Sequence, residues 1–149
     1  MFDKNKRFEF RGYDKDLKKW FYGGYIIKAD YADSPFEKPG TKPAPVKHFI
    51  VFEEMVDWGL PTKLKVSSVD KDSVGQCTGL KDKNGKLIYE GDILCHPQLP
   101  HKVVCEWFQC GFWLNGYQNG AKRNLHDACK FYEVIGNIYE NKELLEDEE

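Results

Sequence analysis

The segment Val74–Asp92, VGQCTGLKDKNGKLIYEGD, contains the clearest folding signal of the chain, because its turn residues and its apolar spacing agree. Two short strand-like runs flank Asp82-Lys83-Asn84-Gly85, and this arrangement is typical of a β-hairpin.

One register for the hairpin uses a two-residue Asn-Gly turn. It would place Lys83 opposite Lys86 and Lys81 opposite Ile88. Like charges directly opposite each other destabilise a strand pair, so this register is disfavoured.

The other register uses a type I turn that starts at Asp82, with Gly85 as a bulge in the left-handed conformation. It places Asp82 opposite Lys86 and Leu80 opposite Ile88, which pairs opposite charges and aligns two apolar side chains. We therefore predict this second register.

Downstream of the hairpin, Gly91 predicts a bend or a barrel corner. Short helical turns are expected at Leu125–Lys130 and at the C-terminus up to Leu145, where Asn141 would be the N-cap. The strands expected in this half are Ile93–His96, Lys102–Gln109, Phe112–Tyr117 and Tyr132–Glu140.

Upstream of the hairpin, alternating charged and aromatic residues predict a strand at Arg7–Tyr13. A turn at Asp14–Asp16 would lead into a second strand, Lys19–Ala29. The pair Gly23-Gly24 within that strand suggests a bend or a bulge. These elements predict an N-terminal hairpin.

The region between the two hairpins begins with a proline-rich segment, Asp30–Lys47, which predicts a long loop. His48–Trp58 starts as a strand, and its second half is compatible with a strand or a short helix. A further strand is expected at Leu64–Val69, and Asp70–Ser73 would turn the chain into the central hairpin.

Composition and element pattern together define the fold class. The chain has 149 residues, of which 15% are aromatic, and aromatic side chains favour pleated, half-buried surfaces. Many short strands without βαβ units predict a mainly β protein with little helix, forming one domain or two small ones that share a core. We divide it into an N-terminal hairpin region (1–62, with the proline-rich loop 30–47), a barrel-like region (63–145) and an acidic tail (146–149).

The overall charge gives no general attraction to nucleic acid or to membranes, because the net charge is −2. A basic excess in residues 1–28 is balanced by an acidic excess in residues 137–149. The chain shows no signal peptide and no long apolar run. Five cysteines without an export signal are typical of reduced thiols, so we expect a cytoplasmic protein.

Cysteine and histidine gather in the C-terminal half. A structural zinc site would need ligands in close pairs such as Cys-x-x-Cys, and none occurs. We therefore predict no metal and no cofactor, with the thiols acting as small apolar side chains. Whether the residues converge in space stays open, as does a zinc-dependent or thiol enzyme. They are Cys95, His96, His101, Cys105, Cys110, His126 and Cys129.

Motifs for catalysis are not recognisable in the sequence. It contains no Gly-x-Ser-x-Gly elbow and no glycine-rich phosphate loop. Glu90 and Asp92 could form a carboxylate pair, but Gly91 between them spoils the geometry, and we expect Asp92 to accept a hydrogen bond from the turn backbone. The sequence predicts a protein that is not an enzyme.

The N-terminal hairpin interleaves basic and aromatic side chains, as single-strand-binding barrels do. An amphipathic hairpin would show the same alternation, with rings inward and charges in water. Nucleic-acid binding is therefore the alternative function. Its candidate residues are Arg7, Arg11, Lys18, Lys19 and Trp20.

Three segments resemble the YopX family of phage and prophage proteins: Arg7–Tyr22, Val74–Leu94 and Glu133–Leu145. The middle segment follows the family pattern almost throughout. Cys77 stands where an aromatic residue is more usual, and Lys142 stands where proline is.

This resemblance implies a β-rich fold with an SH3-like barrel in the C-terminal half, and an origin in a bacteriophage or prophage. It implies no catalytic, cofactor or metal residues. We therefore expect an accessory protein of unknown molecular function that acts through protein contact or self-association, since surplus aromatic side chains are typical of interfaces.

Overall fold

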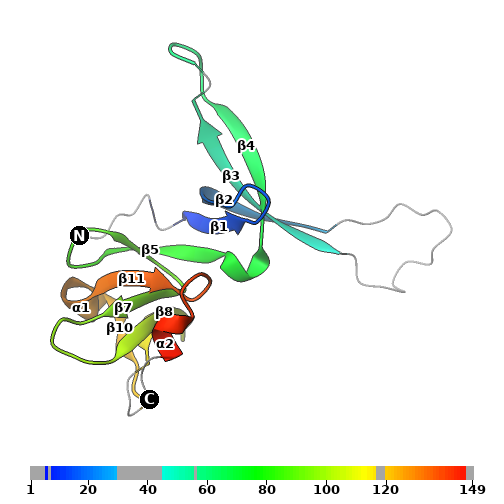
Figure 1. Cartoon of the computed structure of the whole chain (residues 1–149). Coiled ribbons are helices and arrows are strands. Elements are labelled where there is room, and N and C mark those ends of the chain that lie inside the picture. The colour runs from blue at the N-terminus through cyan, green and yellow to red at the C-terminus, as the bar shows by residue number, and fades with distance from the viewer. Residues whose placement is uncertain (1–5, 7, 30–44, 56, 117–119, 147–149) are drawn as a thin grey trace. The chain divides into compact units, whose positions relative to one another are not determined.

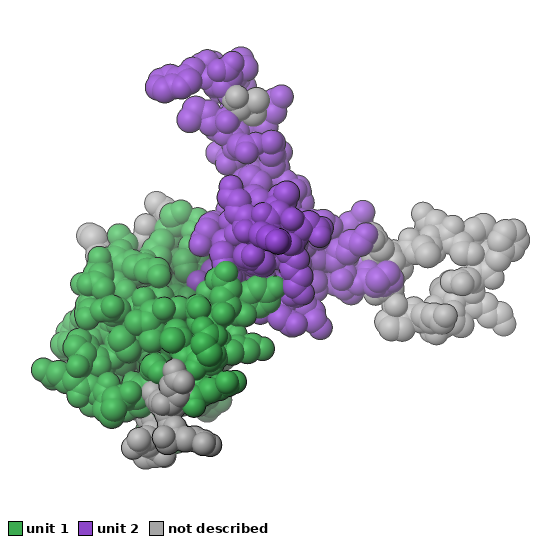
Figure 2. All heavy atoms as spheres, viewed as in Figure 1, with its two compact units in different colours: residues 1–9, 75–149 green, residues 10–74 purple. Residues whose placement is uncertain are grey.

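The computed structural model describes residues 6, 8–29, 45–55, 57–116 and 120–146 (Figure 1). The described strands form two antiparallel sheets, of six and five strands, with little helix. This confirms a mainly β protein. The chain divides into two compact units, shown in different colours in Figure 2. We call residues 10–74 the N-terminal unit, and residues 1–9 with 75–149 the C-terminal unit. The boundary expected between residues 62 and 63 falls inside the N-terminal unit.

The N-terminal unit contains four strands in the order β4-β3-β2-β1. The strand predicted at Leu64–Val69 is confirmed, and the one predicted at Lys19–Ala29 has those bounds. Its elements are β1 (Phe10–Asp14), β2 (Lys19–Ala29), β3 (Val46–Glu54), β4 (Lys63–Val69) and the 3-10 turn η1 (Lys71–Ser73).

Strand β2 runs without a register shift through Gly23-Gly24, so the bulge suggested there is not found. Instead the strand changes its partner at this point. Phe10 of β1 pairs with Gly23, and Gly24 pairs with Val51 of β3. A Cβ atom on Gly23 would lie 2.0 Å from the carbonyl oxygen of Val51, so only glycine allows this close backbone approach.

Two strands of this unit start at least two residues away from their predicted positions. β1 starts at Phe10, three residues later than expected, and Arg7 lies outside the described residues. β3 starts at Val46, so residues 46–47 do not belong to the proline-rich loop. They join the ladder because Val46 pairs with Ala29 and Lys47 with Lys28. Residues 30–44 of that predicted loop are outside the described part of the chain.

The C-terminal unit contains the strand pair β5–β6 and the five-stranded sheet β10-β9-β8-β7-β11. The two predicted helical turns are confirmed. Its elements are β5 (Gly75–Lys81), β6 (Leu87–Tyr89), β7 (Asp92–Cys95), β8 (Lys102–Phe108), β9 (Gly111–Asn115), β10 (Arg123–Asn124), α1 (Leu125–Ala128), η2 (Cys129–Phe131), β11 (Glu133–Asn137) and α2 (Glu143–Glu146).

The central hairpin turns as predicted. The N–H of Gly85 donates to the carbonyl of Asp82 (3.0 Å), and the N–H of Asp82 donates to the carbonyl of Lys86 (2.8 Å). Gly85 has a φ of +84°, and Lys81 pairs with Leu87. These contacts define the type I turn with a glycine bulge.

The register of this hairpin shifts farther from the turn, which the sequence did not predict. After Lys81–Leu87 the next pair is Cys77–Tyr89, and Gly79 between them has a φ of +75°. This conformation suits glycine and marks a β-bulge. Ile88 is nevertheless fully buried, and Leu80 packs against the apolar cluster that contains Ile88.

Two carboxylates hold the hairpin in place. The side chain of Asp82 accepts from the N–H groups of Asn84 (2.8 Å) and Lys86 (2.9 Å), and also from that of Val134 in β11 (3.0 Å). Asp92 accepts from the N–H of Tyr89 (2.8 Å), as expected for a carboxylate that caps the turn. Asp82 thus joins the turn to a strand 52 residues away in sequence.

Most of the buried apolar side chains of the C-terminal unit belong to one cluster. Helix α1 closes one side, and Asn124 caps it by accepting from the N–H of His126 (2.9 Å). The buried members of the cluster are Ile88, Leu94, Val103, Cys105, Leu114, Leu125, Ala128, Cys129 and Tyr132.

The final strand is shorter than predicted. β11 ends at Asn137, whose side-chain oxygen accepts from the N–H groups of Tyr139 and Glu140 and so turns the chain. The side-chain oxygen of Asn141, the expected N-cap, accepts from the N–H of Asn137 (3.2 Å).

The SH3-like barrel expected for this half is not found as a closed barrel among the described strands. The five-stranded sheet keeps two edges, β10 and β11. Closing a barrel requires ladder pairing between the edge strands. β10 has only two residues, and the strand that it pairs with is β9.

Candidate functional site

The cysteines and histidines of the C-terminal half are dispersed. Cys105 and Cys129 lie in the apolar core, and Cys110 is exposed at the β8–β9 turn. The part of the chain that the structure describes contains no group of three or more His, Cys, Asp or Glu side chains that could hold a metal ion. The structure therefore does not bring this set together.

The buried and half-buried thiols are poorly suited to nucleophilic chemistry. Burial raises the pKa of the thiols of Cys77, Cys95 and Cys129 above the ordinary value. A higher pKa lowers the thiolate fraction at neutral pH, and the thiolate is the reactive form.

The residues proposed for nucleic-acid binding fall on different surfaces. Arg11 is buried, and its guanidinium lies 5.0 Å from the centre of the Trp20 ring, so these two are brought together. Lys19 lies over the ring of Phe21, on the opposite face of β2, because successive strand residues alternate. Lys18 sits in the β1–β2 turn with a φ of +52°. Arg7 is outside the described residues.

The N-terminal unit has a different interior from the C-terminal unit. Ile50 and Val69 are its buried apolar residues among those described. Aromatic contacts extend this small core across one face of the sheet: Phe21 stacks on Phe52 with ring centres 4.8 Å apart, and Tyr25 stacks on His48 at 5.9 Å.

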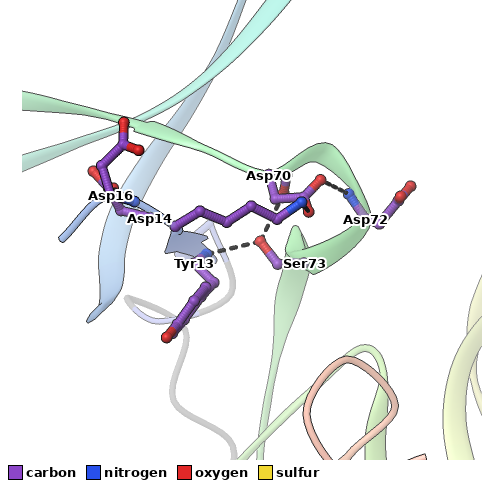
Figure 3. A network of polar contacts seen from close by, with 7 residues as sticks. Tyr13, Asp14, Asp16, Asp70, Asp72 and Ser73 are labelled. Carbon is purple, nitrogen blue, oxygen red and sulfur yellow. Dashed lines mark hydrogen bonds and ion pairs between the residues drawn. The ribbon is translucent and has the colours of Figure 1, made fainter. Parts of the chain in front are cut away.

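Hydrogen bonds join the end of β1 to the turn Asp70–Ser73 (Figure 3). The backbone N–H of Tyr13 donates to the hydroxyl of Ser73 (2.7 Å), and that hydroxyl donates to the carbonyl of Asp70 (2.6 Å). The N–H of Asp70 donates to the carbonyl of Tyr13 (2.9 Å). We call these contacts the Tyr13–Ser73 latch, because they tie the end of β1 to the turn that follows β4.

The carboxylate of Asp14 supports the same connection from a buried position. It accepts from the hydroxyl of Ser67 (2.5 Å) and from the N–H groups of Asp16 and Leu17 (2.9 Å each). These hydrogen bonds, with that of Ser67 the strongest, hold the pKa of Asp14 below its ordinary value. The carboxylate is therefore ionised and structural at neutral pH.

A polar cavity of about 400 Å³ opens beside the latch. Lys15 forms an ion pair with Asp70 there. The lining is balanced in charge and contains no activated nucleophile, so the cavity shows no catalytic arrangement. The lining residues are Asp14, Lys15, Asp16, Val46, Lys47, His48, Ser68, Val69, Asp70 and Lys71.

A second cavity of the N-terminal unit, of about 390 Å³, has an aromatic lining. The stacked rings of Phe21 and Phe52 contribute to it, and Lys65 forms an ion pair with Glu54 there. We call it the aromatic cavity. Its lining residues are Leu17, Lys19, Phe21, Phe52, Glu54, Lys65, Val66 and Ser67.

The connection between β3 and β4 ends in an apolar tip. Trp58 is 94% exposed, and Met55 and Leu60 are also exposed. The backbone around Trp58 is ordered by Asp57, whose side chain accepts from the N–H of Trp58 (2.7 Å) and whose carbonyl accepts from that of Leu60 (3.3 Å). We call Asp57–Leu60 the Trp58 tip.

Sequence reasoning did not single out the Trp58 tip or the aromatic cavity. A tryptophan directly before Gly59-Leu60-Pro61, a turn sequence, was the available signal for the tip, because a turn exposes its side chains. The cavity had no such signal, since Phe21, Phe52 and Lys65 come from three strands.

No helix among the described residues is long and apolar enough to cross a membrane.

The fold and these sites define a mainly β protein with two compact units and no recognisable catalytic centre among the residues described. Comparison with protein families matches the YopX protein family over residues 9–146. The chain therefore belongs to the YopX family, which confirms the resemblance.

No curated protein matches the chain. Among solved structures, the chain is similar to the crystal structure of protein EF1440 from Enterococcus faecalis. The two are 24% identical, the match covers 92% of this chain and 96% of that one, and the TM-score is 0.45.

Proposed function

We propose that this protein is a non-enzymatic accessory protein of a bacteriophage or prophage that acts by binding protein, either a partner or a second copy of itself. The observation that carries the proposal is the Trp58 tip. An indole that is 94% exposed at the end of a strand pair offers a large apolar surface to a partner.

The rest of the N-terminal unit supports this proposal. Isolated exposed apolar residues are ordinary, whereas neighbouring ones mark interaction surfaces. Val66 on β4 pairs with Val51 on β3, and Ile26 on β2 pairs with Phe49 on β3, so these side chains lie next to each other on one face of the sheet. Ile26 and Val66 are both exposed.

The alternative, nucleic-acid binding by the N-terminal hairpin, has weaker support. Binding to phosphates requires several cations on one surface. Arg11 is buried against Trp20, and Lys19 lies on the opposite face of β2. A single-stranded oligonucleotide titrated at low and high salt separates the two functions: strong, salt-dependent binding would favour the alternative.

The experiment that tests protein binding combines two measurements on the full chain. Light scattering after size exclusion reports self-association across a concentration series, and affinity capture from bacterial cells carrying the phage or prophage reports a partner. We expect a dimer or a captured protein, and either to be lost in the variant Trp58→Ala. A strict monomer that captures no protein would overturn the proposal.

A further inference from the structure

We infer that the Trp58 tip of one copy inserts into the aromatic cavity of a second copy, so that two chains form a symmetric dimer. This inference rests on the proposed function and names its partner: a second copy of this chain. Four properties of the N-terminal unit carry it, and they concern shape, charge, symmetry and burial.

The shapes of the tip and the cavity are complementary. The tip presents one exposed indole, and Leu60 of the tip is also exposed. The aromatic cavity, at about 390 Å³, has room for that side chain and is lined by the stacked Phe21 and Phe52. Aromatic side chains attract one another in stacked or edge-on arrangements beyond the area that they bury. The cavity therefore suits an aromatic side chain.

The charges around the two features are also complementary. Asp57 directly precedes Trp58 at the tip. The aromatic cavity is lined by two lysines, Lys19 and Lys65, and by one glutamate, Glu54. Lys65 and Glu54 form an ion pair, which leaves the positive charge of Lys19 in excess. An incoming Asp57 would thus approach a cavity with a net positive lining.

The tip and the cavity lie on the same pair of strands. The tip connects β3 to β4, and both strands contribute to the cavity, through Phe52 and Lys65. Each copy therefore carries the inserting group and the receiving site on the same strand pair. A two-fold axis lets each copy fill the cavity of the other, and such an interface closes after two subunits.

The burial of Trp58 is expected to supply most of the binding free energy of the dimer. Trp58 is the most exposed of the large apolar side chains described, so dimer formation can remove more of its surface from water than of any other. Tryptophan is enriched among residues that dominate interface energies. We therefore expect one side chain on each copy to carry most of the affinity.

The first test compares Trp58→Ala with the matched control Trp107→Ala, which removes a half-exposed tryptophan of the C-terminal unit. Sedimentation velocity over a concentration series measures the dimer dissociation constant. We expect Trp58→Ala to raise it at least about 25-fold, as for a dominant interface residue. The control should leave it within about threefold. Circular dichroism checks that both variants are folded.

The second test blocks the receiving site. Leu17 lines the aromatic cavity from the β1–β2 turn and is exposed, so Leu17→Glu is expected to fold and to place at the cavity a negative charge that repels Asp57. The control is Ile27→Glu, an exposed position of β2 that does not line this cavity. We expect Leu17→Glu to abolish the dimer and Ile27→Glu to keep it.

The outcomes separate this inference from the proposed function. A dimer that persists in Trp58→Ala, an open-ended polymer, or a monomer that captures another protein through Trp58 would each overturn the inference and leave protein binding standing. A monomer that captures nothing would overturn both.

Discussion

The two units of this protein are stabilised in different ways. The C-terminal unit buries a continuous apolar cluster that includes Ile88, Leu114 and Tyr132. The N-terminal unit buries few apolar side chains among those described, and ties its strands together with stacked rings, the Asp14 carboxylate and the Tyr13–Ser73 latch. One unit therefore uses most of its apolar residues for folding, whereas the other leaves many of them at its surface.

The largest expected effect contrasts the same residue type in the two units. Leu114 is fully buried in the C-terminal core, whereas Leu64 on β4 is 73% exposed. Leu114→Ala should lower the free energy of unfolding by about 3–4 kcal/mol, through lost burial and a cavity. Leu64→Ala should change it by no more than about 0.5 kcal/mol. Urea denaturation measures both, and equal losses would remove the distinction between the units.

The next effect concerns the carboxylate of Asp82. Asp82→Ala leaves the N–H groups of Asn84, Lys86 and Val134 without this acceptor, and we expect a loss of about 2–3 kcal/mol. Asp82→Asn keeps one side-chain oxygen and should lose less. Urea denaturation followed by fluorescence gives both values. A neutral Asp82→Ala would mean that the link from the turn to β11 contributes nothing.

A smaller loss of stability is expected when a turn glycine is replaced, and its size should differ between the two units. Gly85 and Gly59 both have left-handed backbone, with φ of +84° and +83°. Gly85→Ala should cost about 1–2 kcal/mol, because a Cβ atom in this conformation meets its own backbone. Gly59→Ala carries the same local strain, but β3 and β4 can adjust at an exposed tip, so we expect a smaller loss. Thermal melting of both variants checks the order.

The smallest effect on stability concerns the hydrogen bond between Ser67 and Asp14 in the N-terminal unit. Asp14 has a pKa below its ordinary value in the folded chain, so its ionised form stabilises the fold at neutral pH. That stability is lost as the pH falls from the unfolded-state pKa through the folded-state pKa. Ser67→Ala removes the strongest hydrogen bond and should cost about 1 kcal/mol at pH 7.

The pH profile of this variant provides the check. Stability is measured by denaturation at a series of pH values from neutral to acidic. Ser67→Ala should lose less stability than the unaltered protein as the solution is acidified, because the pKa of Asp14 then lies closer to its unfolded value. Parallel profiles for the two proteins would contradict the assigned role of the Asp14–Ser67 contact.

Local sequence determined most of the strand positions and the central turn. The turn at Asp82–Gly85 depends on residues within five positions of each other, so its type and its glycine bulge were predictable. The same holds for the strand Lys19–Ala29. It also holds for the helical turn after Asn124, because the Asn124 side chain accepts a hydrogen bond from the N–H of His126, only two residues away. The three quoted segments were also sufficient to indicate the family.

Tertiary structure alone decided which distant residues meet. The hydrogen bond from Val134 to Asp82, the approach of Val51 to Gly23 and the grouping of Phe21, Phe52 and Lys65 around one cavity join separate strands. Periodicity shows that a strand alternates its faces, but not which strand lies beside it or where its register shifts. The same reason explains why Arg11 is buried and why the cysteines and histidines are dispersed: packing between elements, which no local pattern encodes, places each side chain.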